Sequence, residues 1–272
     1  MTARLSRRSH RSLRWAIWLL LALAVGILIA GPELAPHTAT EQVAAPFTAP
    51  SAALPLGSDH LGRDVASRVL HGGRAFLLTS VIAGACGTAF GTAAGLFTTL
   101  TTGRRMSALI SGPLNAVAAA PPIMVLLLVL TALPNRAGLI VGITMTSAPL
   151  SARVTAAATA QLIGRAHLEA AVARGERWPW LIGREILPLI AATLVADLGM
   201  RFVAAVYLVA AAGFLGLATS DADWGRLIVE ALPGAALQPW ALLIPMAGVA
   251  VLAVGANLLA DSLVGRSKKA LA

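Results

Sequence analysis

The chain has 272 residues, of which 57% are hydrophobic and only 12% are charged, and its formal net charge is +9. The charges form clusters separated by long neutral stretches, whereas a soluble protein distributes its charges over its whole surface. This pattern excludes an ordinary water-soluble globular protein and indicates an integral membrane protein.

Six uncharged stretches are near or above the length that a helix needs to cross about 30 Å of hydrocarbon. They cover residues 15–32, 75–103, 106–135, 137–152, 202–220 and 231–260. The fourth stretch is short, but the side chain of Arg153 can extend toward the interface. The fifth span is expected to begin near Ile186 and to contain Asp197 and Arg201. We therefore expect an all-α integral membrane protein with six transmembrane helices.

The beginning of the chain is interpreted as a basic tail, residues 1–14, followed by an uncleaved first transmembrane helix, residues 15–33. The apolar stretch is longer than a usual signal-peptide core, and no clear cleavage site precedes Pro32. Residues 34–72 then form an extracytoplasmic linker rich in Pro, Ala and Thr. Apolar residues on one side of about 62–70 predict a short interfacial helix at its end.

The distribution of Lys and Arg predicts the orientation in the membrane. Of the 21 basic residues, fifteen fall on the side of the N-terminus, five on the other side, and Arg201 lies within a span. The positive-inside rule therefore places both termini and the loop 154–185 in the cytoplasm. Because the basic charge follows topology in this way, we do not expect a nucleic-acid partner.

The five remaining spans form one predicted five-helix core, residues 73–266, followed by a short cytoplasmic tail, residues 267–272. Gly87, Gly91 and Gly95 form a small-residue face for close helix packing. Pro121 and Pro122 should kink or unwind the third span. Such breaks line paths in transporters, but they are also common in other polytopic proteins.

Asp197 and Arg201 are four residues apart, so they share a helix face and can form an ion pair. Charge inside the membrane predicts a functional site by default. A pair that locks the fifth helix against its neighbours is an equally good explanation. Trp224, in an acidic loop between the last two spans, is interpreted as an interface anchor.

The chain shows no motif for catalysis or for a metal site. There is no Ser-His-Asp set and no glycine-rich nucleotide loop with a lysine, and the five histidines lack clear metal-ligand spacing. A pair of His60 and His71 is conceivable as a metal site but weak. The single Cys86 excludes an intrachain disulfide and is expected to pack as a small residue.

The polar segment 154–185 has helical patterning and two tryptophans, which a solvated loop rarely exposes. We expect two short helices that meet at Gly175, where glycine permits a positive φ. Ala170 and Ala171 would leave room for the surface of a partner protein. Pro179 and Pro188 are expected to mark helix starts, with Pro188 opening the fifth span.

Three motifs, in order along the chain, resemble a known family. The series Glu169-Ala170-Ala171-x3-Gly175, followed by Leu187-Pro188, is similar to the E-A-A cytoplasmic loop of permease subunits of ATP-binding-cassette (ABC) importers. The stretch from Leu56 to Asp64 resembles the signature of the dipeptide, oligopeptide and nickel permeases, in their second (DppC/OppC-like) subunit. Its matching residues are Gly57, Asp59, Gly62, Arg63 and Asp64. Residues 214–263 match that subunit in order. Asn115 stands where relatives usually have an aspartate.

The resemblance implies a MetI-like type I ABC importer permease fold, in a bacterial inner membrane, without catalytic residues. It implies that Glu169, Ala170, Ala171, Gly175, Leu187 and Pro188 couple the chain to an ATPase. The implied partners are a second permease subunit, two cytoplasmic ATP-binding subunits, an extracytoplasmic substrate-binding protein and membrane lipid. ATP and Mg²⁺ would bind to the ATPase subunits, and no cofactor to this chain. Asn115, Asp197 and Arg201 are candidates for the translocation path.

Two alternatives from other classes remain at this point. A stand-alone secondary carrier would show charged or unwound sites in two related halves, and no convincing internal repeat is visible. A membrane enzyme or scaffold would show clustered nucleophiles or ligands at one depth, and none is visible. The substrate stays open among dipeptides, longer peptides, metal complexes and other small solutes.

Overall fold

The computed structural model describes residues 19, 22–23, 26, 30–101, 103–163, 165–217 and 220–270. These residues are mainly helical and divide into two compact units. The first unit contains Met1–Val81, Pro134–Arg136 and Ala205–Leu259. The second contains Ile82–Leu133, Ala137–Ala204 and Ala260–Ala272. Most of the predicted first span, residues 15–33, lies outside the described residues.

Among the described residues, four helices are long and apolar enough to cross a membrane: Val65–Leu100, Arg136–Ala160, Trp178–Phe214 and Pro239–Leu258. A fifth candidate is a bent pair of helices, α3 (Arg104–Ala119) and α4 (Pro122–Ala132). The second, fourth, fifth and sixth predicted spans each overlap one of these four helices. The total of six spans stays a prediction, because the first lies mostly outside the described part.

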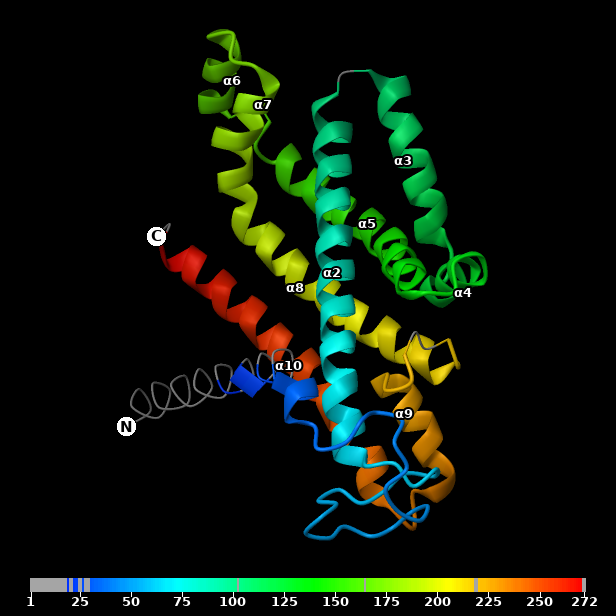
Figure 1. Ribbon diagram of the computed structural model, residues 1–272. Helices are drawn as coiled ribbons and strands as arrows, with labels where there is room; N and C mark the ends of the chain where they lie inside the picture. Colours follow the sequence, from blue (N-terminus) through cyan, green and yellow to red (C-terminus); the bar gives the residue numbers. More distant parts are fainter. Residues whose placement is uncertain are drawn as a thin grey trace, which may run out of the picture. The chain divides into compact units, whose positions relative to one another are not determined.

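The third predicted span is broken at its two prolines. Helices α3 and α4 meet at an angle of 102° around Pro121 and Pro122 (Figure 1). The cause is local: neither proline has a backbone N–H to continue the helix, and each restricts the residue before it. The sequence predicted a kink here, and the structure shows a near-perpendicular turn. None of the residues of α3 is buried.

Small residues hold α2 (Val65–Leu100) against α5 (Arg136–Ala160) in the second unit. A Cβ atom added to Gly87 would lie 2.6 Å from Cβ of Ser147, and one added to Gly95 would lie 2.5 Å from the carbonyl oxygen of Ala152. These distances are far below van der Waals contact. The predicted glycine face is therefore a helix-packing surface, which agrees with its simpler interpretation.

The fifth span begins earlier than expected. Helix α7 (Trp178–Trp180) continues through a π-helical segment, η1 (Leu181–Ile186), into α8 (Leu187–Phe214). The N–H of Leu187 bonds to the carbonyl of Ile182, which is the π-helical spacing. Pro188 cannot donate to the residue four positions earlier, and the wider turn accommodates this loss. Pro179 marks the helix start, as predicted, whereas Pro188 lies within a continuous helix.

In the first unit, residues 35–64 are an ordered segment rather than an extended linker. Two isolated bridges, Gln42 with Arg63 and Ser58 with Asp64, fold the segment back on itself. The side-chain amide of Gln238 donates to the carbonyls of Thr48 and Leu56 at 3.1 and 2.9 Å. The predicted interfacial helix at 62–70 is not separate, because α2 starts at Val65 and runs on without a break.

Helix α9 (Trp224–Ala231), the short 3-10 turn η2 (Leu232–Gly234) and the part of α10 (Pro239–Ala270) up to Leu259 complete the first unit. Trp224 is buried at 1% exposure, and its ring stacks on Phe76 with centroids 5.2 Å apart. Its indole N–H donates to the carbonyl of Val69. The prediction of an interface anchor is therefore wrong: this tryptophan is a core residue that ties α9 to α2.

Candidate functional site

The E-A-A residues lie on α6 (Ala166–Ala173), a short helix of the second unit. Glu169 is in its first turn, and the side chains of Glu169 and Ala170 are exposed. Ala171 is completely buried, in a cluster with Leu168 and Leu181 among others. The expectation that both alanines face a partner is therefore wrong for Ala171. One face of α6 is anchored inside the chain, and the opposite face is open.

Gly175 turns the chain after α6. Its φ of 80° lies in the left-handed region that favours glycine, as the sequence predicted. A Cβ atom at this position would meet nothing within 4 Å. The turn thus depends on backbone conformation alone, and the space around it is free for another molecule.

The apolar cluster connects the E-A-A helix to the start of the fifth span. Leu181 and Ile186 of the π-helical segment are buried in it, and Leu96 of α2 also belongs to it. Leu187 packs partly against this cluster, whereas Pro188 is exposed. These contacts mean that a displacement of α6 would be passed directly to α8.

The signature stretch 56–64 forms two tight turns in the first unit. Gly57 and Gly62 have φ values of 69° and 76°. A Cβ atom on Gly62 would lie 2.0 Å from the carbonyl oxygen of Ala44, so no other residue fits. Between the glycines, the carboxylate of Asp59 accepts the N–H groups of Leu61 and Arg63 at 2.8 and 2.9 Å.

Asp64 begins α2. Its carboxylate accepts the backbone N–H groups of Ala66 and Ser67 at 3.2 and 3.1 Å, which satisfies donors that a helix start leaves free. The hydroxyl of Ser67 also donates to it. This capping role explains why an acidic residue stands immediately before the helix.

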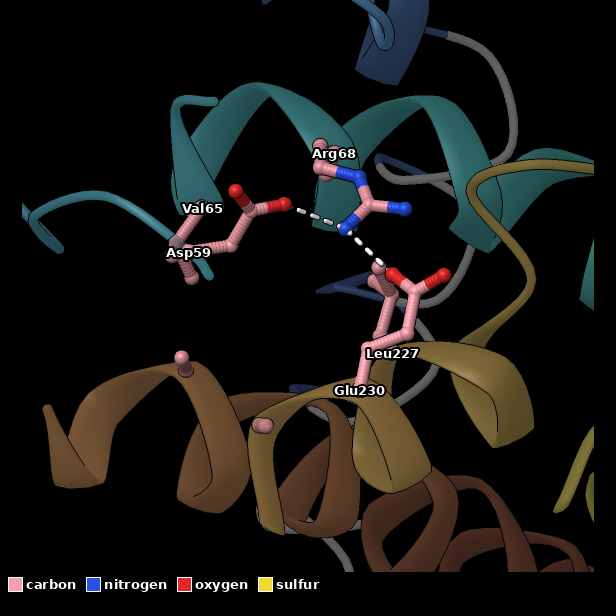
Figure 2. Close-up of a pocket in the computed structure, with 7 residues that line it drawn as sticks. Asp59, Val65, Arg68, Leu227 and Glu230 are labelled. Carbon is pink, nitrogen blue, oxygen red and sulfur yellow. Dashed lines mark hydrogen bonds and ion pairs between the residues drawn. The ribbon is translucent and has the colours of Figure 1, made fainter. Parts of the chain in front are cut away.

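Asp59 and Arg63 belong to a buried network of charges with Arg68 and Glu230, hereafter the charge network. Figure 2 shows the guanidinium of Arg68 between the two carboxylates, with its Nη1 2.5 Å from Asp59 and 2.8 Å from Glu230. Arg63 bonds the same two carboxylates at 2.7 and 3.1 Å. Only 1% of the Arg68 side chain is exposed. The network therefore fastens the signature stretch to α9.

Both carboxylates of the charge network are held in the ionised form. Burial raises the pKa of Asp59, but the N–H groups of Arg63 and Leu61 and the charge of Arg68 outweigh it, so this pKa is lowered. Burial also raises the pKa of Glu230, but its hydrogen bond with Arg68 and the charges of Arg68 and Arg63 outweigh it and lower this pKa. Each arginine thus has a charged partner.

Asp59, His60 and Glu230 also bring possible metal-ligand atoms within 4.8 Å of one another. Both carboxylates, however, already bond to the guanidinium groups of Arg63 and Arg68. Two fixed positive charges oppose the binding of a cation at this place. We therefore interpret the group as part of the charge network rather than as a metal site.

Asp223 is a second buried carboxyl in the first unit, and its environment is different. It caps α9, accepting the N–H of Gly225 at 2.9 Å. Burial raises the pKa of Asp223 to about 6, and the backbone bonds from Gly225 and Arg226 and the charge of Arg226 offset burial only in part. This group therefore changes its charge near pH 6.

The candidates for the translocation path fall into two separate places in the second unit. Asp197 and Arg201 form the predicted ion pair at 3.2 Å, and both residues are buried. Ser151 of α5 donates its hydroxyl to the other oxygen of Asp197. The pair thus links α8 to α5 and is closed to solvent, which favours the helix-locking explanation. Asn115 lies elsewhere: it is exposed and bonds Arg153 at 3.0 Å.

Several important residues were not singled out from the sequence. Arg68 and Glu230 are 162 positions apart, and no local pattern predicts their contact. Ser151 carries no distinguishing signal among the many small residues of α5. Arg153 was noted only as the end of an apolar stretch. A signal did exist for Arg68, since four charged residues fall within positions 59–68 of a chain that is only 12% charged.

The comparisons with known proteins agree with this geometry. Residues 87–271 match the family of binding-protein-dependent transport system inner membrane components. The chain belongs to this family. This permease is 28% identical over 270 residues to a putative peptide transport system permease protein of Brucella abortus, covering 97% of the chain and 89% of the relative. It is 27% identical over 267 residues to the dipeptide transport system permease protein DppC of Haemophilus influenzae, covering 94% and 90%.

The fold agrees as well. An inward-facing structure of the MetNI methionine ABC transporter aligns with a TM-score of 0.58 at 17% identity, covering 72% of this chain and 96% of that one. A second crystal form of the same transporter gives a TM-score of 0.56 at 18% identity. The predicted MetI-like permease fold and the predicted membership among ABC importer permeases are thus confirmed. A permease of this family is a non-catalytic inner-membrane component.

Proposed function

We propose that this chain is one of two permease subunits of an ATP-driven importer that carries peptides or related small solutes. Relatives named as peptide and dipeptide permeases support this substrate class. The partners would be a second permease, two cytoplasmic ATP-binding subunits and an extracytoplasmic substrate-binding protein. ATP and Mg²⁺ would bind only to the ATP-binding subunits.

The surface of α6 carries this proposal. Glu169, Ala170 and Gly175 are exposed, although the same short helix is anchored through Ala171 to the buried cluster. Trp178 is also 49% exposed, close to the same turn. Large exposed aromatic residues beside small ones are typical of sites where a partner binds. An anchored helix with an open outer face is suited to receive force from an ATP-binding subunit.

The charge distribution supports a cytoplasmic position for this segment. Residues 154–185, hereafter the coupling segment, and both termini would lie in the cytoplasm, because most Lys and Arg residues fall on that side. The stretch 34–72 and α9 would lie outside. The coupling segment would then face the cytoplasmic ATP-binding subunits, and the ordered segment 35–64 would face the binding protein.

The proposed mechanism is alternating access. When the ATP-binding subunits close on ATP, they would move α6, and the buried cluster would carry this movement to the helix Trp178–Phe214. Leu181 and Ile186 sit in this cluster within a π-helical segment, a feature often found at functional sites. Transport would therefore depend on the contact made by Glu169 to Gly175.

The test uses the complete transporter reconstituted with its partner subunits. Glu169→Lys and Gly175→Val should leave the complex assembled in the membrane but reduce substrate-stimulated ATP hydrolysis at least about tenfold, which corresponds to ~1.4 kcal/mol. Glu33→Lys is the control, because Glu33 is also an exposed glutamate and lies outside the segment. Normal stimulated hydrolysis in the first two variants, or purification of a functional carrier without ATP-binding subunits, would refute the proposal.

A further inference from the structure

A cavity of about 300 Å³ opens on the surface of the ordered segment 35–64, in the first unit. Its volume is near the lower limit for a small-molecule pocket, so it suits a single side chain of another molecule. Both apolar and polar side chains line it: Pro46 and Leu61 on the one hand, and Thr40, Gln42, His60 and Arg63 on the other.

The turn Asp59–Gly62 places two of these residues at the surface. The N–H of Gly62 donates to the carbonyl of Asp59 at 3.1 Å, and the carboxylate of Asp59 accepts the N–H of Leu61 at 2.8 Å. Asp59 and Gly62 are buried, whereas Leu61 is 50% exposed and His60 is partly exposed. The buried residues of the signature stretch therefore hold His60 and Leu61 in fixed positions, and such loop residues on a rigid framework are typical of binding sites.

The ring of His60 has an unmet hydrogen bond. Its Nδ1 is buried, but no atom in the part of the chain that the structure describes bonds to it. Buried polar atoms are nearly always bonded, so this nitrogen calls for an explanation. Because no bond at Nδ1 fixes the ring, the ring can turn a nitrogen toward the cavity. His60 is thus available to bond a group from outside the chain.

The charges beside the cavity are balanced. Arg63 belongs to a set of ion pairs, each of at most 3.1 Å, in which three arginines meet three carboxylates: Arg63, Arg68 and Arg226 with Asp59, Asp221 and Glu230. An ionised side chain would gain little from such a surface. An uncharged side chain with an apolar body and a hydrogen-bonding end fits both kinds of lining residue. Tyrosine has this character and is enriched at protein interfaces.

We propose that this cavity binds an uncharged side chain of the extracytoplasmic substrate-binding protein, with Leu61 packed against its apolar body and His60 bonded to its polar end. The inference rests on the proposed function, which supplies the partner. The distribution of Lys and Arg supports an outer position for residues 34–72, the side on which such a partner arrives. The inference adds the surface where the partner docks and the chemistry of the contact.

The first experiment measures the affinity of the binding protein for the complete transporter in lipid nanodiscs. Thr40→Trp fills the cavity, and Leu61→Asp places a carboxylate in its apolar part, so each should raise Kd at least about tenfold. Both residues are exposed, so the fold should be kept. His60→Phe keeps a ring but loses both nitrogens, and it should raise Kd several-fold. Unchanged Kd values in these variants overturn the inference.

The control is Ala53→Asp, because Ala53 is exposed in the same segment and does not line the cavity. This variant should bind as the wild type does, and a loss equal to that of Leu61→Asp would show that the cavity is not the site. The ratio of Kd between Thr40→Trp and the wild type should also change by less than about twofold between about 0.05 M and about 0.5 M NaCl. A ratio that falls steeply with salt would identify an ionised occupant and overturn the inference.

The second experiment uses a thiol in place of Leu61. Cys86 is the single native cysteine, so a Cys86→Ala background allows Leu61→Cys to carry the only thiol. In intact cells this thiol should react from outside with a membrane-impermeant maleimide. In the purified transporter, binding protein at about ten times its Kd should slow the reaction about tenfold, whereas dialanine alone should not. A thiol that does not react from outside, or that dialanine alone protects, overturns the inference.

The outcomes separate this inference from the proposed function. If Thr40→Trp and Leu61→Asp bind normally while Glu169→Lys loses stimulated ATP hydrolysis, the coupling proposal stands and the cavity is not the docking site. If the two cavity variants weaken binding while Glu169→Lys keeps stimulated hydrolysis, the docking surface stands and the coupling proposal does not.

Discussion

The signature stretch and the coupling segment are both family motifs, but the chain treats their charges in opposite ways. Asp59, Arg63 and Asp64 are at most 7% exposed and are bonded within the first unit. Glu169 is exposed at the surface of the second unit. A motif whose charged side chains are bonded inside the chain stabilises the fold of that chain. A motif whose charged side chain is exposed is available to bind another molecule.

The glycines of the two motifs show the same contrast. Gly57, Gly62 and Gly175 all have positive φ. A Cβ atom on Gly57 would lie 1.7 Å from Nε2 of Gln238, within the chain itself, whereas one on Gly175 would meet nothing. The signature glycines are thus required by internal packing. At Gly175 the chain itself imposes only the backbone conformation, and any further restriction would come from a partner.

The largest expected effect is on the charge network. Arg68→Met removes a buried cation and leaves Asp59 and Glu230 with too little positive charge, which should lower the free energy of unfolding by about 3–5 kcal/mol. Thermal unfolding of the purified protein in detergent micelles measures this loss. Arg74→Gln is the control, because the Arg74 and Glu33 side chains are 47% and 63% exposed, and such surface pairs contribute about 0–1 kcal/mol. Equal midpoints for both variants would contradict the structural role of the network.

The second prediction concerns pH and separates Asp223 from the carboxylates of the network. Its pKa of about 6 in the folded state exceeds the usual value of 3.8, so the folded protein holds this proton more tightly than the unfolded chain. Stability should therefore fall as pH rises from about 4 to 6 and stay lower above this window. Asn at this position keeps the helix cap and cannot ionise.

The variant Asp223→Asn should accordingly be more stable than the wild type at pH 7.5, by about 2 kcal/mol. Its unfolding midpoint should also change less between pH 4.5 and 7. The lowered pKa values of Asp59 and Glu230 act in the opposite direction, because their stabilising contribution is lost only as the pH falls through those lowered values. If the unfolding midpoint of the variant changed with pH as that of the wild type does, burial would not raise the pKa of Asp223.

The smallest effect on stability, and the sharpest test of the coupling segment, comes from its two alanines. Ala171 is completely buried and Ala170 is exposed. Ala171→Leu should destabilise the protein by about 1–3 kcal/mol through overpacking. Ala170→Leu should change the free energy of unfolding by less than about 0.5 kcal/mol and yet impair substrate-stimulated ATP hydrolysis. If Ala170→Leu left hydrolysis intact, its face of α6 would not be the coupling surface.

The sequence alone predicted much of the fold because hydrophobic length and charge placement act locally. The four unbroken apolar helices, the positive φ of Gly175 and the pairing of Asp197 with Arg201 all depend on residues within one helix or turn. The break at Pro121 was also predicted, though not its size. In each case the physical cause lies within a few residues of the feature.

The features that were missed depend on residues far apart in the chain. Trp224 lies in a polar loop sequence, yet it is buried because α9 folds onto α2. Glu230 joins the charge network across 162 positions. Ala171 differs from Ala170 only in the face of α6 that it occupies, and this short helix gives too few turns for a periodic pattern to show which face is buried.

The sharp bend between α3 and α4 has a consequence for how the protein is made. A helix leaves its last carbonyls without helical partners, and α3 ends at the bend, where the N–H of Ala120 bonds back to the carbonyl of Val117. In hydrocarbon each unpaired backbone group costs several kcal/mol, so residues 104–132 are poorly suited to enter lipid alone. During synthesis this segment should therefore remain beside the insertion machinery until a later helix such as α5 shields it, which makes membrane integration depend on the order in which the helices emerge.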